Sequence, residues 1–259
     1  MKPHQRITRM EGSYLSAELI GDQNQNHHHC ISASGVASML LRIALVLLLL
    51  HLATFWIVTQ GHKDSDFLRR LDAYFNFNHE NNFPSFFSSI LLLLSAFLLW
   101  VVYKSTAVTD TGRSRWLLLS AIFLFLTLDE AVRIHERIEQ VTRLVFTSDA
   151  GGFLAWTWII PYTLFAVAVA LYNYRFVMRF PKPVRTRFIV SGALFVFAAA
   201  GIESIEGYLM KATAEDPVVL MITTTVQEFL EMVSIIVFVA GILHYLALRS
   251  KKLDLTFKP

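Results

Sequence analysis

The sequence predicts an all-α protein, a polytopic membrane helical bundle with about six transmembrane helices. Hydrophobic residues make up 54% of the 259 residues, and the mean hydropathy is +0.49, values typical of multi-pass membrane proteins. The apolar runs have the length of membrane-spanning helices and lack the short alternating pattern of transmembrane strands. A helical bundle is therefore expected rather than a membrane β-barrel.

The apolar segments divide the chain into its expected parts. The predicted spans are residues 38–59, 83–103, 116–135, 153–174, 188–209 and 218–247. Residues 37–248 then form a single six-helix membrane domain. The polar residues 1–36 precede it as a disordered cytoplasmic tail, and residues 249–259 follow it as a short basic tail.

Lysine and arginine residues are distributed unequally between the two predicted sides of the membrane. The side that holds both termini carries 15 of them, and the opposite side carries 7. Because basic residues accumulate in cytoplasmic loops, this asymmetry places both termini in the cytoplasm. The expected location is the cell inner (plasma) membrane. We attribute the net charge of +3 to this topology rather than to nucleic-acid binding. The lipid bilayer is the expected partner.

Cofactor motifs are few. Cys30 is the only cysteine, which excludes an internal disulfide and a multi-cysteine zinc or iron–sulfur site. The sequence contains no Walker A loop and no dinucleotide fingerprint, so no nucleotide cofactor is expected. The histidine-rich tract at residues 26–30 is interpreted as part of the flexible tail, with binding of a soft or borderline metal ion as the alternative.

The third span is too short for the membrane that it must cross. Its apolar stretch from Trp116 to Leu128 has thirteen residues, about 20 Å of helix against a hydrocarbon core of about 30 Å. Asp129, Glu130 and Arg133 follow and must lie inside the membrane or at its edge. Ionisable groups at such depths are usually paired, bound to a ligand or exposed to a polar cavity.

Two further helices carry carboxylates in the same half of the membrane. Span five needs Glu203 and Glu206 to reach a sufficient length, and span six places Glu228 and Glu231 about 15–20 Å from its outer end. Each pair has the spacing Glu-x-x-Glu, which places both side chains on one helix face. Such pairs on adjacent helices repel strongly unless they bind protons or cations. We interpret the shared depth of three acidic helices as a cation site.

A helical wheel refines the third helix. If the helix is continuous, Asp129 and Glu136 lie about 20° apart and form one candidate ligand face. Glu130 aligns instead with Arg137, so ion pairs along its own helix are expected. His135 lies about 120° from Asp129, so both reach one centre only if the helix ends or bends between them.

The candidate metal ligands come from these three helices. They are Asp129, His135, Glu136, Glu203, Glu206, Glu228 and Glu231. An oxygen-rich set with few imidazoles favours a divalent metal such as iron or manganese, with calcium as an alternative, over zinc or copper. The same carboxylates can also form a proton relay, because burial favours their protonated form.

Three classes of function are compatible with these residues. The leading expectation is binding of a divalent cation for transport or metal handling. The first alternative is a membrane-embedded di-metal carboxylate oxidoreductase or hydrolase acting on a lipid-soluble substrate, which needs His135 or His51 at the cluster. The second is a non-catalytic scaffold or assembly factor whose acidic residues are interfacial and ion-paired.

The interfacial interpretation makes its own structural predictions. In it, residues 217–225 form a surface helix separate from span six. The polar residues 76–82 before span two are expected to form a solvated outer loop, with capping of the acidic site as the alternative. For His51 alone, a packed and hydrogen-bonded role is expected.

Two motifs carry a resemblance to a group of known proteins. They are Leu-Asp-Glu at 128–130 followed by His-Glu at 135–136, and Glu-Phe-Leu-Glu-Met at 228–232. Together they resemble uncharacterised multi-pass bacterial inner-membrane proteins with LDE…HE and ExLEM elements. The resemblance covers spans three to six and implies a membrane location without an assigned activity.

The late motif has a second resemblance. Glu228-Phe-Leu-Glu231 is similar to the Glu-Gly-Leu-Glu core of oxidase-dependent iron permeases, whose carboxylates pass iron. Gln227 stands here in place of the preceding arginine of that motif, and Phe229 in place of its glycine. The similarity implies that such a pair on a membrane helix can serve a cation.

Overall fold

The computed structural model describes residues 32–60, 65–145, 152–213 and 216–250 of the chain. Within these ranges the regular secondary structure is helical and no β-strand is present, which confirms the all-α prediction. Ala33–Pro259 form one unit, separate from Met1–Ser32. The expected tails, with the histidine-rich tract, lie almost entirely outside the described residues.

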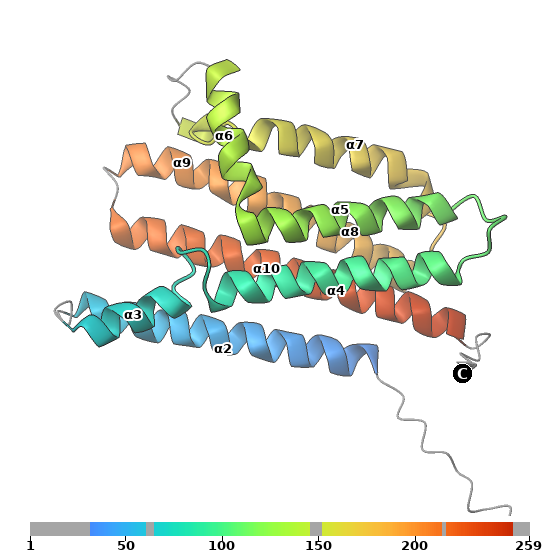
Figure 1. Ribbon diagram of the computed structural model, residues 1–259, viewed down its shortest axis with the longest axis horizontal. Helices are drawn as coiled ribbons and strands as arrows, with labels where there is room; N and C mark the ends of the chain where they lie inside the picture. Colours follow the sequence, from blue (N-terminus) through green and yellow to red (C-terminus); the bar gives the residue numbers. More distant parts are fainter. Residues whose placement is uncertain (1–31, 61–64, 146–151, 214–215, 251–259) are drawn as a thin grey trace, which may run out of the picture. The chain divides into compact units, whose positions relative to one another are not determined.

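Five helices are long and apolar enough to cross a membrane, which supports the membrane class. They are α2 (Ala33–Thr59), α4 (Phe83–Ser105), α7 (Ile159–Val177), the segment Lys182–Met210 and the segment Val218–Arg249. They run along a common direction in Figure 1 and match five of the predicted spans. The last of them belongs to α10 (Pro217–Ser250), which is one uninterrupted helix. A separate surface helix at residues 217–225 is therefore not formed.

The remaining predicted span corresponds to α5 (Arg113–Val132). This helix lies along α4 in Figure 1, and Ser120 Oγ donates a hydrogen bond of 2.8 Å to the carbonyl oxygen of Ala96. It carries four ionisable side chains, those of Arg113, Arg115, Asp129 and Glu130. These charged residues distinguish α5 from the five apolar helices. Because α5 pairs with α4, Asp129 and Glu130 lie at the same end as the loop between α3 (Asp66–Phe75) and α4.

α10 packs against three of the other long helices. It contacts α2, α4 and α8 (Lys182–Val196). One apolar cluster joins it to α2 and α4 and includes the buried Met232, while a second surrounds the buried Trp116 and includes Ile242. Removal of these side chains from the solvent stabilises the packing. The rotation of α10 is thereby fixed, and with it the direction of its carboxylates.

A break in the helix follows α5, whereas the sequence predicted a span that continues to residue 135. Arg133 adopts a left-handed backbone conformation with φ 59°, which is uncommon for a residue with a side chain. α6 (Ile134–Val145) then starts in a new direction. Asp129 stabilises the break, because its Oδ1 accepts a 2.7 Å hydrogen bond from the backbone N–H of His135. The expectation of a continuous helix through residue 135 was therefore wrong.

The segment from α8 to α9 (Glu203–Ala212) contains a short π-helix, η2 (Phe197–Ile202). π-helical turns are rare and occur frequently at functional sites. Most residues of this turn are alanine or glycine, so their small side chains leave room for its wider backbone. Because the turn ends directly before Glu203, it sets the direction in which Glu203 and Glu206 point.

His51 joins three parts of the fold. The side chain is fully buried on α2, and its Nε2 lies 2.8 Å from Thr225 Oγ1 on α10. Its Nδ1 accepts a 3.3 Å hydrogen bond from the backbone N–H of Phe77, whose ring stacks on the imidazole. The packed, hydrogen-bonded role predicted for His51 is confirmed. Phe77 belongs to the segment 76–82, which links α3 (Asp66–Phe75) to α4.

Candidate functional site

A cavity lies at the end of the bundle near α3, α6 and the segment 76–82. Its volume is about 900 Å³, within the range of ligand-binding pockets. Side chains from α3, α4, α5, α6, α7, α9 and α10 line it, together with residues of the segments 78–81 and 156–158. Elements far apart in the sequence therefore meet at one space.

Acidic side chains dominate the polar lining of this cavity. All seven candidate ligands line it: Asp129, His135, Glu136, Glu203, Glu206, Glu228 and Glu231. Glu80, Glu130 and Glu139 line it as well, so every glutamate in the described ranges faces the same space. The described lining combines these nine carboxylates with the guanidinium of Arg133 and the imidazoles of His79 and His135.

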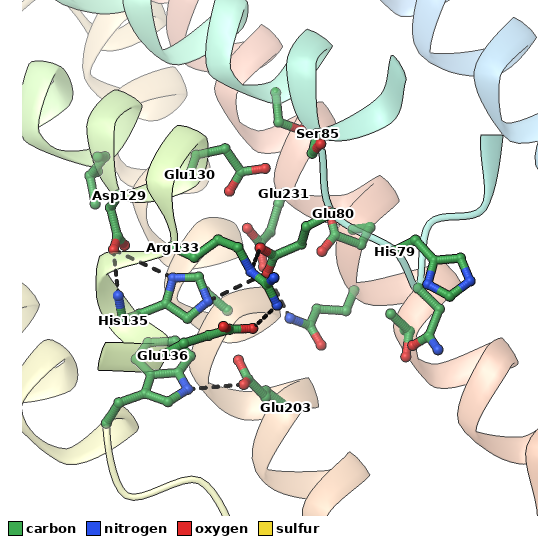
Figure 2. A pocket seen from close by; sticks show the side chains of 18 of the residues that line it. His79, Glu80, Ser85, Asp129, Glu130, Arg133, His135, Glu136, Glu203 and Glu231 are labelled. Atoms are coloured by element: carbon green, nitrogen blue, oxygen red, sulfur yellow. Dashed lines mark hydrogen bonds and ion pairs between the residues drawn. The ribbon is translucent and has the colours of Figure 1, made fainter. Parts of the chain in front are cut away.

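Arg133 lies between two of the carboxylates. Its guanidinium forms salt bridges with Glu80, from the segment before α4, and with Glu136 of α6. The left-handed backbone at Arg133 makes both contacts available, because it turns the chain between α5 and α6. The two glutamates thus share one cation that belongs to the chain itself (Figure 2).

His135 lies between Asp129 and Glu80. Its Nδ1 is 3.4 Å from Asp129 Oδ1, and its Nε2 is 3.7 Å from Glu80 Oε1. Burial alone would lower the pKa of this imidazole, but the hydrogen bond to Asp129 and the nearby carboxylates outweigh burial and raise the pKa above its ordinary value. The imidazolium form of His135 is therefore more favoured than that of an exposed histidine.

Arg133 and His135 both affect the pKa of the Glu80 carboxyl. Burial raises the pKa of its carboxyl above the ordinary value, and the positive charges of Arg133 and His135 oppose that rise only in part. Glu136 and Asp129 add to the rise through like-charge repulsion. From the sequence, Glu80 was expected in a solvated outer loop, with capping of the acidic site as the alternative. The contacts of Glu80 correspond to that alternative.

Glu139 has a structural role. Its Oε2 accepts hydrogen bonds from Thr157 Oγ1 at 3.0 Å and from the backbone N–H of Trp158 at 2.7 Å. Its Oε1 lies 2.5 Å from Arg143 Nε. These contacts satisfy the free N–H of Trp158, the residue that precedes α7, and hold α6 against it. Both oxygens of Glu139 are therefore committed to the fold.

The remaining five carboxylates form no salt bridge within the described ranges, and we call them the unpaired group. The group comprises Glu130, Glu203, Glu206, Glu228 and Glu231. Three of them accept hydrogen bonds from neutral donors: Glu203 from Trp158 Nε1 at 3.1 Å, Glu206 from Thr224 Oγ1 at 3.1 Å and Glu231 from Gln227 Nε2 at 3.4 Å.

Glu130 and Glu228 stand out within the unpaired group. In the part of the chain that the structure describes, neither has a hydrogen bond or a salt bridge, and they repel each other electrostatically. Figure 2 shows Glu130 and Glu231 pointing into the space beside Arg133, with Glu203 on its far side. The unpaired group thus gathers five carboxyl groups that have no salt bridge within the part of the chain that the structure describes.

The helix break changes two expectations from the sequence. Glu130 was expected to form ion pairs along its own helix, but within the described ranges it forms none and faces the cavity. Asp129 and Glu136 were expected to share one ligand face, whereas they contact His135 and Arg133 respectively. His135 and Asp129 were expected to reach one centre only if the helix ended or bent between them. The helix does end there, at Val132.

The carboxylates do not form a ready-made metal centre. Among the described residues, no group of three or more His, Cys, Asp or Glu side chains is arranged to hold a single metal ion. The acidic groups instead surround a larger volume. A bare metal ion bound here would require side chains of the unpaired group to move toward one another.

Taken together, these features define a multi-pass helical membrane protein with an acidic cavity at one end of its bundle. Residues 40–246 match the family described as Domain of unknown function (DUF8692), and the chain belongs to this family. No curated protein matches the chain. No solved structure matches it either.

Proposed function

We propose that this protein is a cation-binding membrane protein whose ligand occupies the acidic cavity. The observation that carries the proposal is the unpaired group, five carboxylates on three helices that have no salt bridge within the described ranges. Carboxylates gathered in a protein interior are unfavourable without a counter-charge. A cation that enters the cavity supplies this charge, and its release or onward passage constitutes transport or handling at the membrane.

A divalent metal ion is the simplest cation that fits this proposal. Carboxylate oxygens suit iron(II), manganese and calcium, and the resemblance of residues 228–231 to the core of iron permeases agrees with such a ligand. The five residues of the unpaired group would hold the ion, because their carboxylates have no salt bridge within the described ranges. Asp129, His135 and Glu136 would act indirectly, by holding Arg133 and the helix break in place.

We do not extend the proposal to a di-metal enzyme. That alternative needs an imidazole from His51 or His135 at the metal. Both nitrogens of His51 are hydrogen-bonded outside the cavity, and both nitrogens of His135 face carboxylates that hold the α5–α6 break. Neither ring is free to act as a ligand.

The proposed orientation places the cavity toward the outer face of the inner membrane, with both termini in the cytoplasm. It rests on the excess of lysine and arginine on the side of the termini. We expect a green fluorescent protein fused after Pro259 to fluoresce and alkaline phosphatase at the same position to be inactive. Fusions after Thr213 should give the reverse result. Active phosphatase after Pro259 would contradict the orientation.

Manganese binding tests the proposed site directly. The full chain, purified in detergent, should bind Mn²⁺ in a titration followed by electron paramagnetic resonance. Glu228→Gln should weaken binding by roughly tenfold or more, because it removes a charge that has no other partner. Asp66→Asn is the matched control, since Asp66 is exposed, pairs with Arg69 and does not line the cavity. Equal affinity in wild type and Glu228→Gln would reject the proposed site.

A further inference from the structure

We propose that the ligand of the acidic cavity is an elongated organic polyamine, a linear chain of methylene groups that carries two or more ammonium groups. This inference rests on the proposed function, since it specifies the kind of cation that the cavity binds. Its ammonium groups would pair with the unpaired group, and its methylene segments would lie against the apolar part of the wall.

The size of the cavity and the spacing of its carboxylates favour an organic cation over a bare metal ion. The volume of about 900 Å³ is that of a pocket for an organic ligand. A metal ion needs several oxygen atoms within about 2.0–2.6 Å of one point, and no three described acidic or imidazole groups are so arranged. Carboxylates that surround a large space can instead pair with several positive groups spaced along one ligand.

The wall of the cavity is apolar as well as acidic. Leu92 of α4, Leu126 of α5 and Ile235 of α10 line it. The last two lie one helical turn from Glu130 and Glu231. Trp158 and Tyr162 add aromatic rings that pack edge-to-face, with centroids 5.0 Å apart. Aliphatic and aromatic surfaces stabilise methylene chains, and aromatic faces attract ammonium groups. A hydrated metal ion gains nothing from such surfaces.

An unsatisfied hydroxyl group also points to a ligand with N–H donors. Ser88 lines the cavity from α4 and is 5% exposed. Its Oγ is buried and has no hydrogen-bond partner. A buried hydroxyl group without a partner is unfavourable. An ammonium group in the cavity would donate a hydrogen bond to this oxygen.

The chain itself provides an analogue of the proposed ligand. Arg133 is a cationic group on a short methylene stem, and it binds Glu80 and Glu136 at the same time. Its two contacts show that carboxylates on separate elements here can share one nitrogen-based cation. Figure 2 shows Glu130, Glu203 and Glu231 near Arg133. These carboxylates have no such cation within the described ranges, and a polyamine would supply one.

Isothermal titration calorimetry with spermidine tests this inference on the full chain in detergent. We expect spermidine to bind and Glu228→Gln to weaken its affinity by about tenfold or more, while Asp66→Asn leaves it unchanged. Glu130→Gln is a second variant with the same expected effect, in case Glu228→Gln does not fold. Linear diamines should bind more tightly as their chain lengthens toward the span of the cavity. The neutral 1,8-octanediol should not bind.

The outcomes separate this inference from the proposed function. Binding of Mn²⁺ or Ca²⁺ without binding of spermidine would overturn the polyamine and leave the cation site intact. Diamine affinity that does not depend on chain length would overturn an elongated ligand. Failure of spermidine and of both metal ions to bind a protein with a normal melting transition would reject the inference and the proposed function together.

Discussion

The double variant Glu228→Gln, Glu231→Gln is expected to melt at a higher temperature than the wild type when no cation is added. Glutamine keeps the size of each side chain and removes two negative charges from the unpaired group. Like charges in a wall of low dielectric constant repel more strongly than in water, so their removal favours the folded state. A rise in the melting temperature of about 5 °C is expected for a chain of this size.

The same variant should lose its response to cations. A ligand that binds only the folded state raises the melting temperature in proportion to its occupancy. Mn²⁺ and spermidine should therefore stabilise the wild type and leave the double variant unchanged, as measured by differential scanning fluorimetry in detergent. Asp66→Asn should behave as the wild type does. A lower melting temperature with an unchanged cation response would show that these glutamates serve the fold rather than a site.

A rise in stability with a loss of binding is the pattern of a functional site, since residues kept for function are often unfavourable for the fold. Glu139 illustrates the opposite case. Both of its oxygens have partners in α6 or at the start of α7, so its carboxylate stabilises the chain. The contrast between Glu139 and Glu228 shows that acidic residues lining one cavity can have different roles.

The apolar pattern was sufficient to predict the helices and the gathering of acidic residues. Runs of helical length located the spans, and span length then required Asp129, Glu203 and Glu228 to share a depth. In the structure all three line one cavity. The depth of a residue in the membrane follows from its position along the helix, and an error of a few residues in the helix ends changes this depth little.

The detailed pairing could not be predicted, because it depends on the break at Arg133. No glycine, proline or asparagine marks that position, and a left-handed arginine has no sequence signal. With a continuous helix, Glu130 was placed beside Arg137, and Asp129 beside Glu136. The break instead turns Arg133 toward Glu80, a residue whose contribution depends on the tertiary position of the segment 76–82.

The trait that could have identified Glu130 is charge balance. The third helix carries more acidic groups near its end than one arginine can neutralise, so one carboxylate had to face a polar space. To decide which carboxylate this is, one must know the partners of Arg133, which in the structure are Glu80 and Glu136. Glu80 lies more than fifty residues before Glu136 in the chain, and only the fold brings them together.

His51→Ala is expected to lower the stability of the protein more than any single change in the cavity. It removes the acceptor of the Phe77 N–H, the contact with Thr225 and the ring stacked on Phe77. Loss of a fully buried side chain and of its hydrogen bonds typically lowers the free energy of unfolding by about 3–5 kcal/mol. A decrease of roughly 10 °C in the melting temperature is expected.

Two further variants separate the contribution of the hydrogen bonds of His51 from that of its side-chain packing. His51→Asn keeps an oxygen where Nδ1 lies and should recover part of the stability, because the Phe77 N–H again has an acceptor. His244→Ala, at a half-buried histidine near Arg187, should change the melting temperature far less. An unchanged melting temperature in His51→Ala would contradict the structural role.

Cation binding gives an independent measure of the same role. Below its melting transition, His51→Ala should bind Mn²⁺ or spermidine with wild-type stoichiometry, since His51 bonds to Thr225 and Phe77 rather than to the unpaired group. A stable His51→Ala protein that lost cation binding would place the imidazole at the ligand. That result would favour the alternative of a di-metal enzyme, because it would supply the nitrogen ligand that the carboxylates of α9 and α10 lack.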